Sequence, residues 1–88
     1  MMLSETVDLR FGVIRARGHL TAQGADLLRG TADSLRGSGH SRVVLDLGGV
    51  RAADASGLDV LRALRDDFAE DGGELVVQHL ARLTAEPV

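Results

Sequence analysis

Three aspartates and one serine stand close together near the middle of the chain, and their types could do chemistry. Asp46 ends an apolar run, Asp54 follows after a short loop, and Ser56 and Asp59 come next. Paired carboxylates can share general acid–base work, and a serine beside a base can act as a nucleophile. A structural interpretation of the three aspartates is favoured. Asp46 is expected to end a strand, Asp54 to lie in a turn, and Asp59 to lie in the first turn of a helix, where the helix dipole stabilises a carboxylate. We therefore expect no catalytic residue.

The sequence around Ser56 does not match the motif of a catalytic serine. It lacks the glycine two residues before the serine that a nucleophile elbow uses, and no motif ties a histidine to it. We expect Ser56 to cap a helix, with Asp59 completing a capping box. The chain has no lysine for a phosphate-binding P-loop. Histidines without zinc-ligand spacing stand at His19, His40 and His79. We expect no metal and no cofactor.

Length and composition narrow the class of protein. Eighty-eight residues are enough for one domain, which we place at residues 1–88. The net charge of −3 comes without a cluster of basic residues, which disfavours nucleic acid as a partner. The absence of cysteine fits a reducing cytoplasm. No apolar run approaches the ~20 residues of a membrane span, so we expect no direct membrane insertion.

Hydrophobic periodicity predicts the elements that position these residues. Alternating side chains predict strands over 6–10 and 13–17, and Thr21 is placed to cap the helix that follows. That helix buries a stripe of small and aliphatic side chains, and the next helix buries Leu58, Leu61, Leu64 and Phe68. Residues 42–47 are apolar almost throughout, which is typical of a central strand covered on both faces. Residues 74–78 form the last strand.

The resulting order is β-β-α-β-α-β, which defines an α/β domain. Two successive β-α-β crossovers demand parallel pairing, and both are expected to be right-handed. The short link between the first two strands makes them antiparallel, so the sheet is mixed. If the strands neighbour one another in chain order, both helices lie on one face of the sheet.

The central segment resembles the signature of the STAS family, which contains the anti-sigma factor antagonists and their relatives. Asp46-Leu47 is followed by Val50 and by Asp54-x-Ser56-Gly57-Leu58, and Gly18-His19-Leu20-Thr21 resembles the family's step before its first helix. The resemblance covers nearly the whole chain. It implies a bacterial, cytoplasmic, non-enzymatic switch protein of transcription regulation. Such a protein binds an anti-sigma factor that is also a serine kinase, and so releases a sigma factor.

The resemblance also assigns a partner-binding region and exposes a departure from the family. In typical members the residue after the motif aspartate is phosphorylated, and the added charge breaks partner binding at the helix N-terminus. That position is Ala55, which has no hydroxyl group. The neighbouring Ser56 is a substitute phosphorylation site, but its expected role as a helix cap disfavours its phosphorylation. The partner-binding residues that the resemblance implies are Asp54, Ala55, Ser56, Gly57 and Leu58.

Two further functions remain open at this point. One is an accessory subunit of a membrane transport ATPase, a role that other short STAS proteins play. The other is a small enzyme, or an anion- or ligand-binding protein, that uses the helix N-terminus at Ser56.

The resemblance implies a third helix after the last strand, and we expect it to be truncated, so that either the domain is clipped or a partner covers the surface that this helix would bury. Only Leu80 to Val88 remain, with Leu80 and Leu83 placed to form a short stub. We expect the last strand to form a sheet edge and the domain to self-associate as a homodimer.

Overall fold

The order β-β-α-β-α-β is confirmed by the structure, a computed structural model that describes residues 3–79 of the chain. The sheet is mixed and has the strand order β1-β2-β3-β4. The first pair is antiparallel, and β2, β3 and β4 run parallel. The elements are β1 (Ser4–Asp8), β2 (Val13–Leu20), α1 (Ala22–Gly37), β3 (Arg42–Ala53), α2 (Ala55–Glu70) and β4 (Glu74–Gln78).

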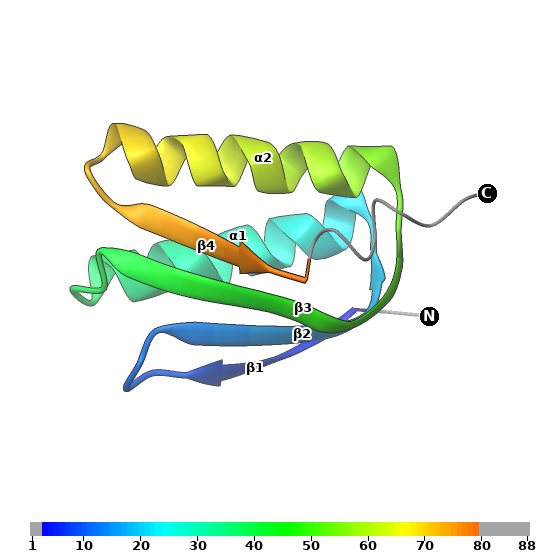
Figure 1. Cartoon of the computed structure of the whole chain (residues 1–88), viewed down its shortest axis with the longest axis horizontal. Coiled ribbons are helices and arrows are strands. Elements are labelled where there is room, and N and C mark those ends of the chain that lie inside the picture. The colour runs from blue at the N-terminus through cyan, green and yellow to red at the C-terminus, as the bar shows by residue number, and fades with distance from the viewer. Residues whose placement is uncertain (1–2, 80–88) are drawn as a thin grey trace.

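Both helices lie on the same face of the sheet, as chain-order pairing of the strands requires (Figure 1). Leu28 and Leu35 of α1 are fully buried, as are Leu64 and Phe68 of α2. They pack against the buried side chains of the strands, which include Ile14, Leu20, Val43, Leu45, Leu47 and Leu75. The core is therefore almost entirely aliphatic. Phe68 is its aromatic side chain, while Phe11 is 66% exposed.

The first hairpin differs from the sequence prediction at both ends. β1 ends at Asp8, because the Asp8 carboxylate accepts hydrogen bonds from the backbone N–H groups of Arg10 and Phe11. These bonds turn the chain two residues earlier than predicted. β2 continues past the predicted end at residue 17 and reaches Leu20.

β3 is much longer than the predicted strand over residues 42–47. Glycine suggested a loop after Leu47, but the strand continues through Gly48 and Gly49 to Ala53. A Cβ atom on Gly49 would lie 2.7 Å from the Cβ of Arg17, so the missing side chain lets the strands stay close. The pairing register shifts here, as a β-bulge does. Asp46 is therefore inside the strand, and its prediction as a strand end is wrong.

The prediction that β3 is covered on both faces is also wrong for the part of the chain that the structure describes. Val43, Leu45 and Leu47 point toward the helices and are buried. Val44 and Asp46 point the other way and are only half-buried, because both described helices cover the same face. The opposite surface, called here the open sheet face, carries the outward side chains of the strands.

β4 forms one edge of the described sheet and β1 the other. The expected self-association through β4 stays a prediction. The predicted stub at Leu80 and Leu83 lies outside the described residues.

We predict that Leu28→Ala lowers the free energy of unfolding by about 2–5 kcal/mol, because it leaves a cavity where α1 meets the sheet. Leu28 is fully buried, whereas its neighbour Leu27 is 58% exposed. The matched variant Leu27→Ala should change stability by less than about 0.5 kcal/mol. Urea unfolding followed by circular dichroism compares the two. Equal losses would contradict this placement of α1.

Candidate functional site

The junction between β3 and α2 turns the chain from strand to helix within one residue. β3 ends at Ala53, α2 begins at Ala55, and Asp54 between them has an extended backbone. The Asp54 carboxylate accepts a hydrogen bond from the Gly57 N–H at 2.7 Å. Its backbone N–H donates to the Leu20 carbonyl at 3.1 Å. Asp54 is therefore the N-cap of α2 and also a bridge to the end of β2.

The predicted cap at Ser56 is wrong. Ser56 lies inside the first turn of α2 and is exposed, because Asp54 already satisfies the N–H of Gly57. Asp59 does not complete a capping box; its carboxylate lies 3.4 Å from a guanidinium nitrogen of Arg62. Aspartate caps helices as well as serine does, so Asp54 was an equally good candidate in the sequence. The Ser56 hydroxyl is not used by the cap.

Gly57 holds the first turn of α2 against the end of β2. A Cβ atom on Gly57 would lie 2.8 Å from the Leu20 carbonyl oxygen and 3.0 Å from the carbonyl carbon of Thr21. Only glycine fits such a close approach of backbone to backbone. Thr21 itself caps α1, as predicted, by accepting from the Gly24 N–H at 3.1 Å. The two helices therefore begin at the same end of the sheet (Figure 1).

The surface at the start of α2 is formed by small side chains and by backbone N–H groups of the first helical turn. Ala55 and Ser56 are exposed, Gly57 is buried and Leu58 is half-buried. The first N–H groups of a helix have no partner within the helix, and the dipole makes this end positive. A shallow hollow beside it is lined by residues that include His19, Thr21 and Asp54. The five predicted partner-binding residues thus form one continuous turn, called here the α2 N-terminal surface.

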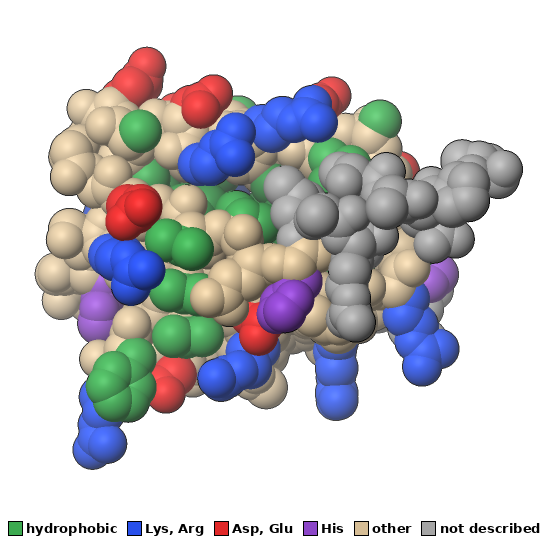
Figure 2. All heavy atoms as spheres, viewed as in Figure 1, with side chains coloured by type: hydrophobic (Ala, Val, Ile, Leu, Met, Phe, Trp, Pro, Cys, Tyr) green, Lys and Arg blue, Asp and Glu red, His purple; other side chains and the backbone are tan. Residues whose placement is uncertain are grey.

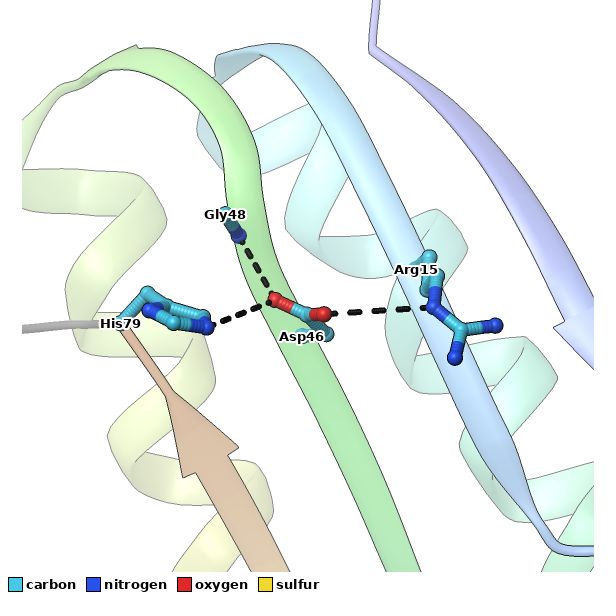
Figure 3. A network of polar contacts seen from close by, with 4 residues as sticks. All are labelled: Arg15, Asp46, Gly48 and His79. Carbon is cyan, nitrogen blue, oxygen red and sulfur yellow. Dashed lines mark hydrogen bonds and ion pairs between the residues drawn. The ribbon is translucent and has the colours of Figure 1, made fainter.

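The three aspartates of the sequence analysis are not brought together. Asp54 caps α2 and Asp59 lies on the exposed side of that helix, whereas Asp46 lies on the open sheet face. Figure 3 shows what surrounds Asp46: Oδ1 accepts from the Gly48 N–H at 2.9 Å and lies 3.5 Å from Nε2 of His79. Oδ2 lies 4.0 Å from Nε of Arg15. This group was not predicted from the sequence, because Arg15 and His79 are distant from Asp46 in the chain.

Two further features of residues 3–79 concern metal binding and membrane insertion. Within this range, His, Asp and Glu side chains form no group of three or more that could hold a metal ion. The same residues contain no helix that is long and apolar enough to cross a membrane.

Comparison with known proteins agrees with this geometry. The domain family described as "Mlab, STAS domain" matches residues 5–88, so the chain belongs to the STAS family. No curated protein sequence shows significant similarity to the chain.

Two solved structures share the fold. The structure titled "Crystal Structure Analysis of Mglu" matches with a TM-score of 0.69 and 22% identity over 81% of this chain, which spans only 18% of that chain. The anti-sigma factor antagonist SpoIIAA in its unphosphorylated form matches with a TM-score of 0.61 and 12% identity. That match covers 85% of this chain and 70% of SpoIIAA. At these identities, the likeness establishes the fold.

We predict that Asp54→Ala lowers the free energy of unfolding by about 1 kcal/mol, because the Gly57 N–H loses its acceptor. Asp54→Asn should retain most of the stability, since asparagine also caps helices. Ser56→Ala should leave stability unchanged within about 0.5 kcal/mol. Thermal and urea unfolding of the three variants give the values. A larger loss from Ser56→Ala than from Asp54→Ala would contradict the cap assignment.

Proposed function

We propose that the chain is a non-enzymatic protein-binding module that acts as an anti-sigma factor antagonist in the cytoplasm. Its partner is an anti-sigma factor or a related kinase-like protein, which docks on the α2 N-terminal surface. The main observation behind the proposal is that this turn is held in a fixed position at the end of the sheet. Asp54 joins it to β2 and β3, and the close approach of Gly57 fixes its distance from the sheet. A preorganised surface of this kind loses little entropy on binding.

The chemistry of the surface favours docking over catalysis. The exposed side chains are the methyl group of Ala55 and the hydroxyl of Ser56, and Asp54 is committed to its cap. Small side chains let a partner approach the backbone of the first turn closely, and the charge of this helix end is already balanced by the Asp54 cap. Membership of the STAS family supports the same assignment, because the family resemblance implies a binding module.

Partner binding is constitutive in one respect: it is not regulated by phosphorylation at the position that the family usually uses. Ala55 follows the capping aspartate directly and is exposed, but it has no oxygen to accept a phosphoryl group. The exposed hydroxyl of Ser56, one residue further on, is the substitute acceptor. Because Ser56 does not cap the helix, the structural objection to its modification is removed.

The same alanine favours a second candidate function. A docking surface that cannot be switched at Ala55 suits a permanent accessory subunit, such as one bound to a membrane transport ATPase. Capture of partners from the native host, followed by mass spectrometry, separates the two functions. Recovery of an anti-sigma factor supports the antagonist, and recovery of a transport ATPase supports the accessory subunit.

We predict that Ala55→Asp abolishes binding to the captured partner. The new carboxylate lies at an exposed helix N-terminus, where it should stabilise the free domain by about 0.3–1 kcal/mol. In the complex the partner would remove water from this carboxylate, and the cost of desolvating the charge opposes binding. The matched variant is Ala63→Asp, an exposed position about two turns along α2, which should bind as the wild type does. Isothermal titration calorimetry measures both, and unchanged affinity for Ala55→Asp would place the docking surface elsewhere.

We also predict that incubation with ATP and a captured kinase-like partner adds no phosphate to the chain, because Ala55 has no hydroxyl group to accept one. Intact mass measurement of the wild type and of Ser56→Ala tests this directly. An added phosphate that disappears in Ser56→Ala would identify Ser56 as the switch. That result would contradict constitutive binding and leave the docking surface in place.

A further inference from the structure

The open sheet face carries a hollow that is separate from the α2 N-terminal surface. It measures about 430 Å³ and is bounded by β1, β2 and β3. Small-molecule sites commonly occupy ~300–1,000 Å³. Its polar lining residues are Ser4, Glu5, Thr6, Arg15, Arg17 and Asp46, with the backbone of Gly48 and Gly49. The Glu5 carboxylate accepts a hydrogen bond from the Thr31 hydroxyl of α1. Figure 2 shows basic side chains projecting along the strand side of the molecule, with acidic and histidine side chains among them.

The β-bulge in β3 creates this hollow. Asp46 pairs with Arg15 and Gly49 pairs with Arg17, so two residues of β3 face one residue of β2. The two glycines bring no side chain into the space, and Gly49 has no room for one, because its Cβ would meet Arg17 at 2.7 Å. Bulges are rare in parallel pairs and are over-represented beside active sites. The bottom of the hollow, called here its floor, is therefore the backbone of Gly48 and Gly49, and charged side chains surround it.

The charges around this floor are incompletely paired. Nε of Arg15 lies 4.0 Å from Asp46, and the terminal nitrogens of Arg15 point away from that carboxylate (Figure 3). Nε of Arg17 donates to the Ser4 hydroxyl at 3.4 Å, and within residues 3–79 Arg17 forms no ion pair. Two arginines with spare donors thus line the same hollow as the Asp46 carboxylate, which lies beside Arg15.

We propose that this hollow binds a free α-amino acid with an apolar side chain. The ligand's carboxylate is held by Arg15 and Arg17, whose planar forks match it. Its ammonium group is held by Asp46, which lies beside Arg15 as the two charges lie beside each other in an amino acid. The Asp46 carboxylate repels a doubly charged anion such as phosphate, which therefore binds more weakly.

The apolar part of the ligand has a place on the same face. Val13 and Val44 are paired across β2 and β3, two residues before Arg15 and Asp46. Side chains two residues apart on a strand point to the same side. Both valines are half-buried, as is Val76 beside them on β4. A branched aliphatic side chain can cover them and bury apolar area.

The test is a titration of the isotope-labelled protein, followed by its amide spectrum, with four separate probes. L-leucine carries both charges, 4-methylpentanoate lacks the ammonium group, 3-methylbutylamine lacks the carboxylate, and inorganic phosphate is the control anion. We expect L-leucine to shift the amides of Arg15, Arg17, Gly48 and Gly49 in a saturable way, and to bind more tightly than the other three. No saturable shift with L-leucine, or tighter binding of phosphate, would overturn the proposal.

Two charge-matched variants complete the test. Arg17→Gln removes one fork and should raise the dissociation constant for L-leucine about tenfold or more, as loss of a hydrogen bond to a charged group does. Arg65→Gln changes an exposed arginine of α2 and should bind L-leucine as the wild type does. Equal affinity of Arg17→Gln and the wild type would overturn the assignment. The site and its test do not depend on the proposed docking function, because the variants leave the α2 N-terminal surface unchanged.

Discussion

The close contact between Gly57 and the end of β2 is the constraint on which the functional end of the molecule depends. A Cβ atom at this position would meet the Leu20 carbonyl oxygen at 2.8 Å, so any other residue would push α2 away from the sheet. The same carbonyl accepts the N–H of Asp54 at 3.1 Å, and Asp54 in turn caps the helix. One short stretch of backbone thus fixes where β2 ends and where α2 begins. The proposed partner would meet a preformed turn there.

The one-sided arrangement of the helices gives the molecule two different surfaces. On the covered face, aliphatic side chains from both helices and the strands form the core, which stabilises the fold but presents no chemistry. At the end of that core lies the α2 N-terminal surface, with small side chains suited to protein contact. On the open sheet face, alternation along the strands places Arg15, Arg17 and Asp46 outward, beside the glycine bulge. Docking and ligand binding can therefore occur at separate places on one small domain.

Much of the fold was predictable from the sequence, because periodicity marks both helices and β4, and the Thr21 cap and the helix stripes are confirmed. The failures at Asp8 and Asp54 share a cause. Asp8 and Asp54 each satisfy backbone N–H groups through side-chain bonds, and a sequence does not show which of several polar residues does so. Gly48 and Gly49 indicated a loop, yet close contact with β2 kept them in the strand. The group around Asp46 was not predictable, since only tertiary pairing brings Arg15 and His79 to it.

We propose that partners dock on the α2 N-terminal surface. The most direct measurement is the amide spectrum of the isotope-labelled chain with and without its unlabelled partner captured from the native host. We expect the largest changes at residues 54–58 and at the neighbouring end of β2 around His19 and Leu20. Changes confined to the open sheet face around Arg15 and Gly49, with residues 54–58 unaffected, would contradict it.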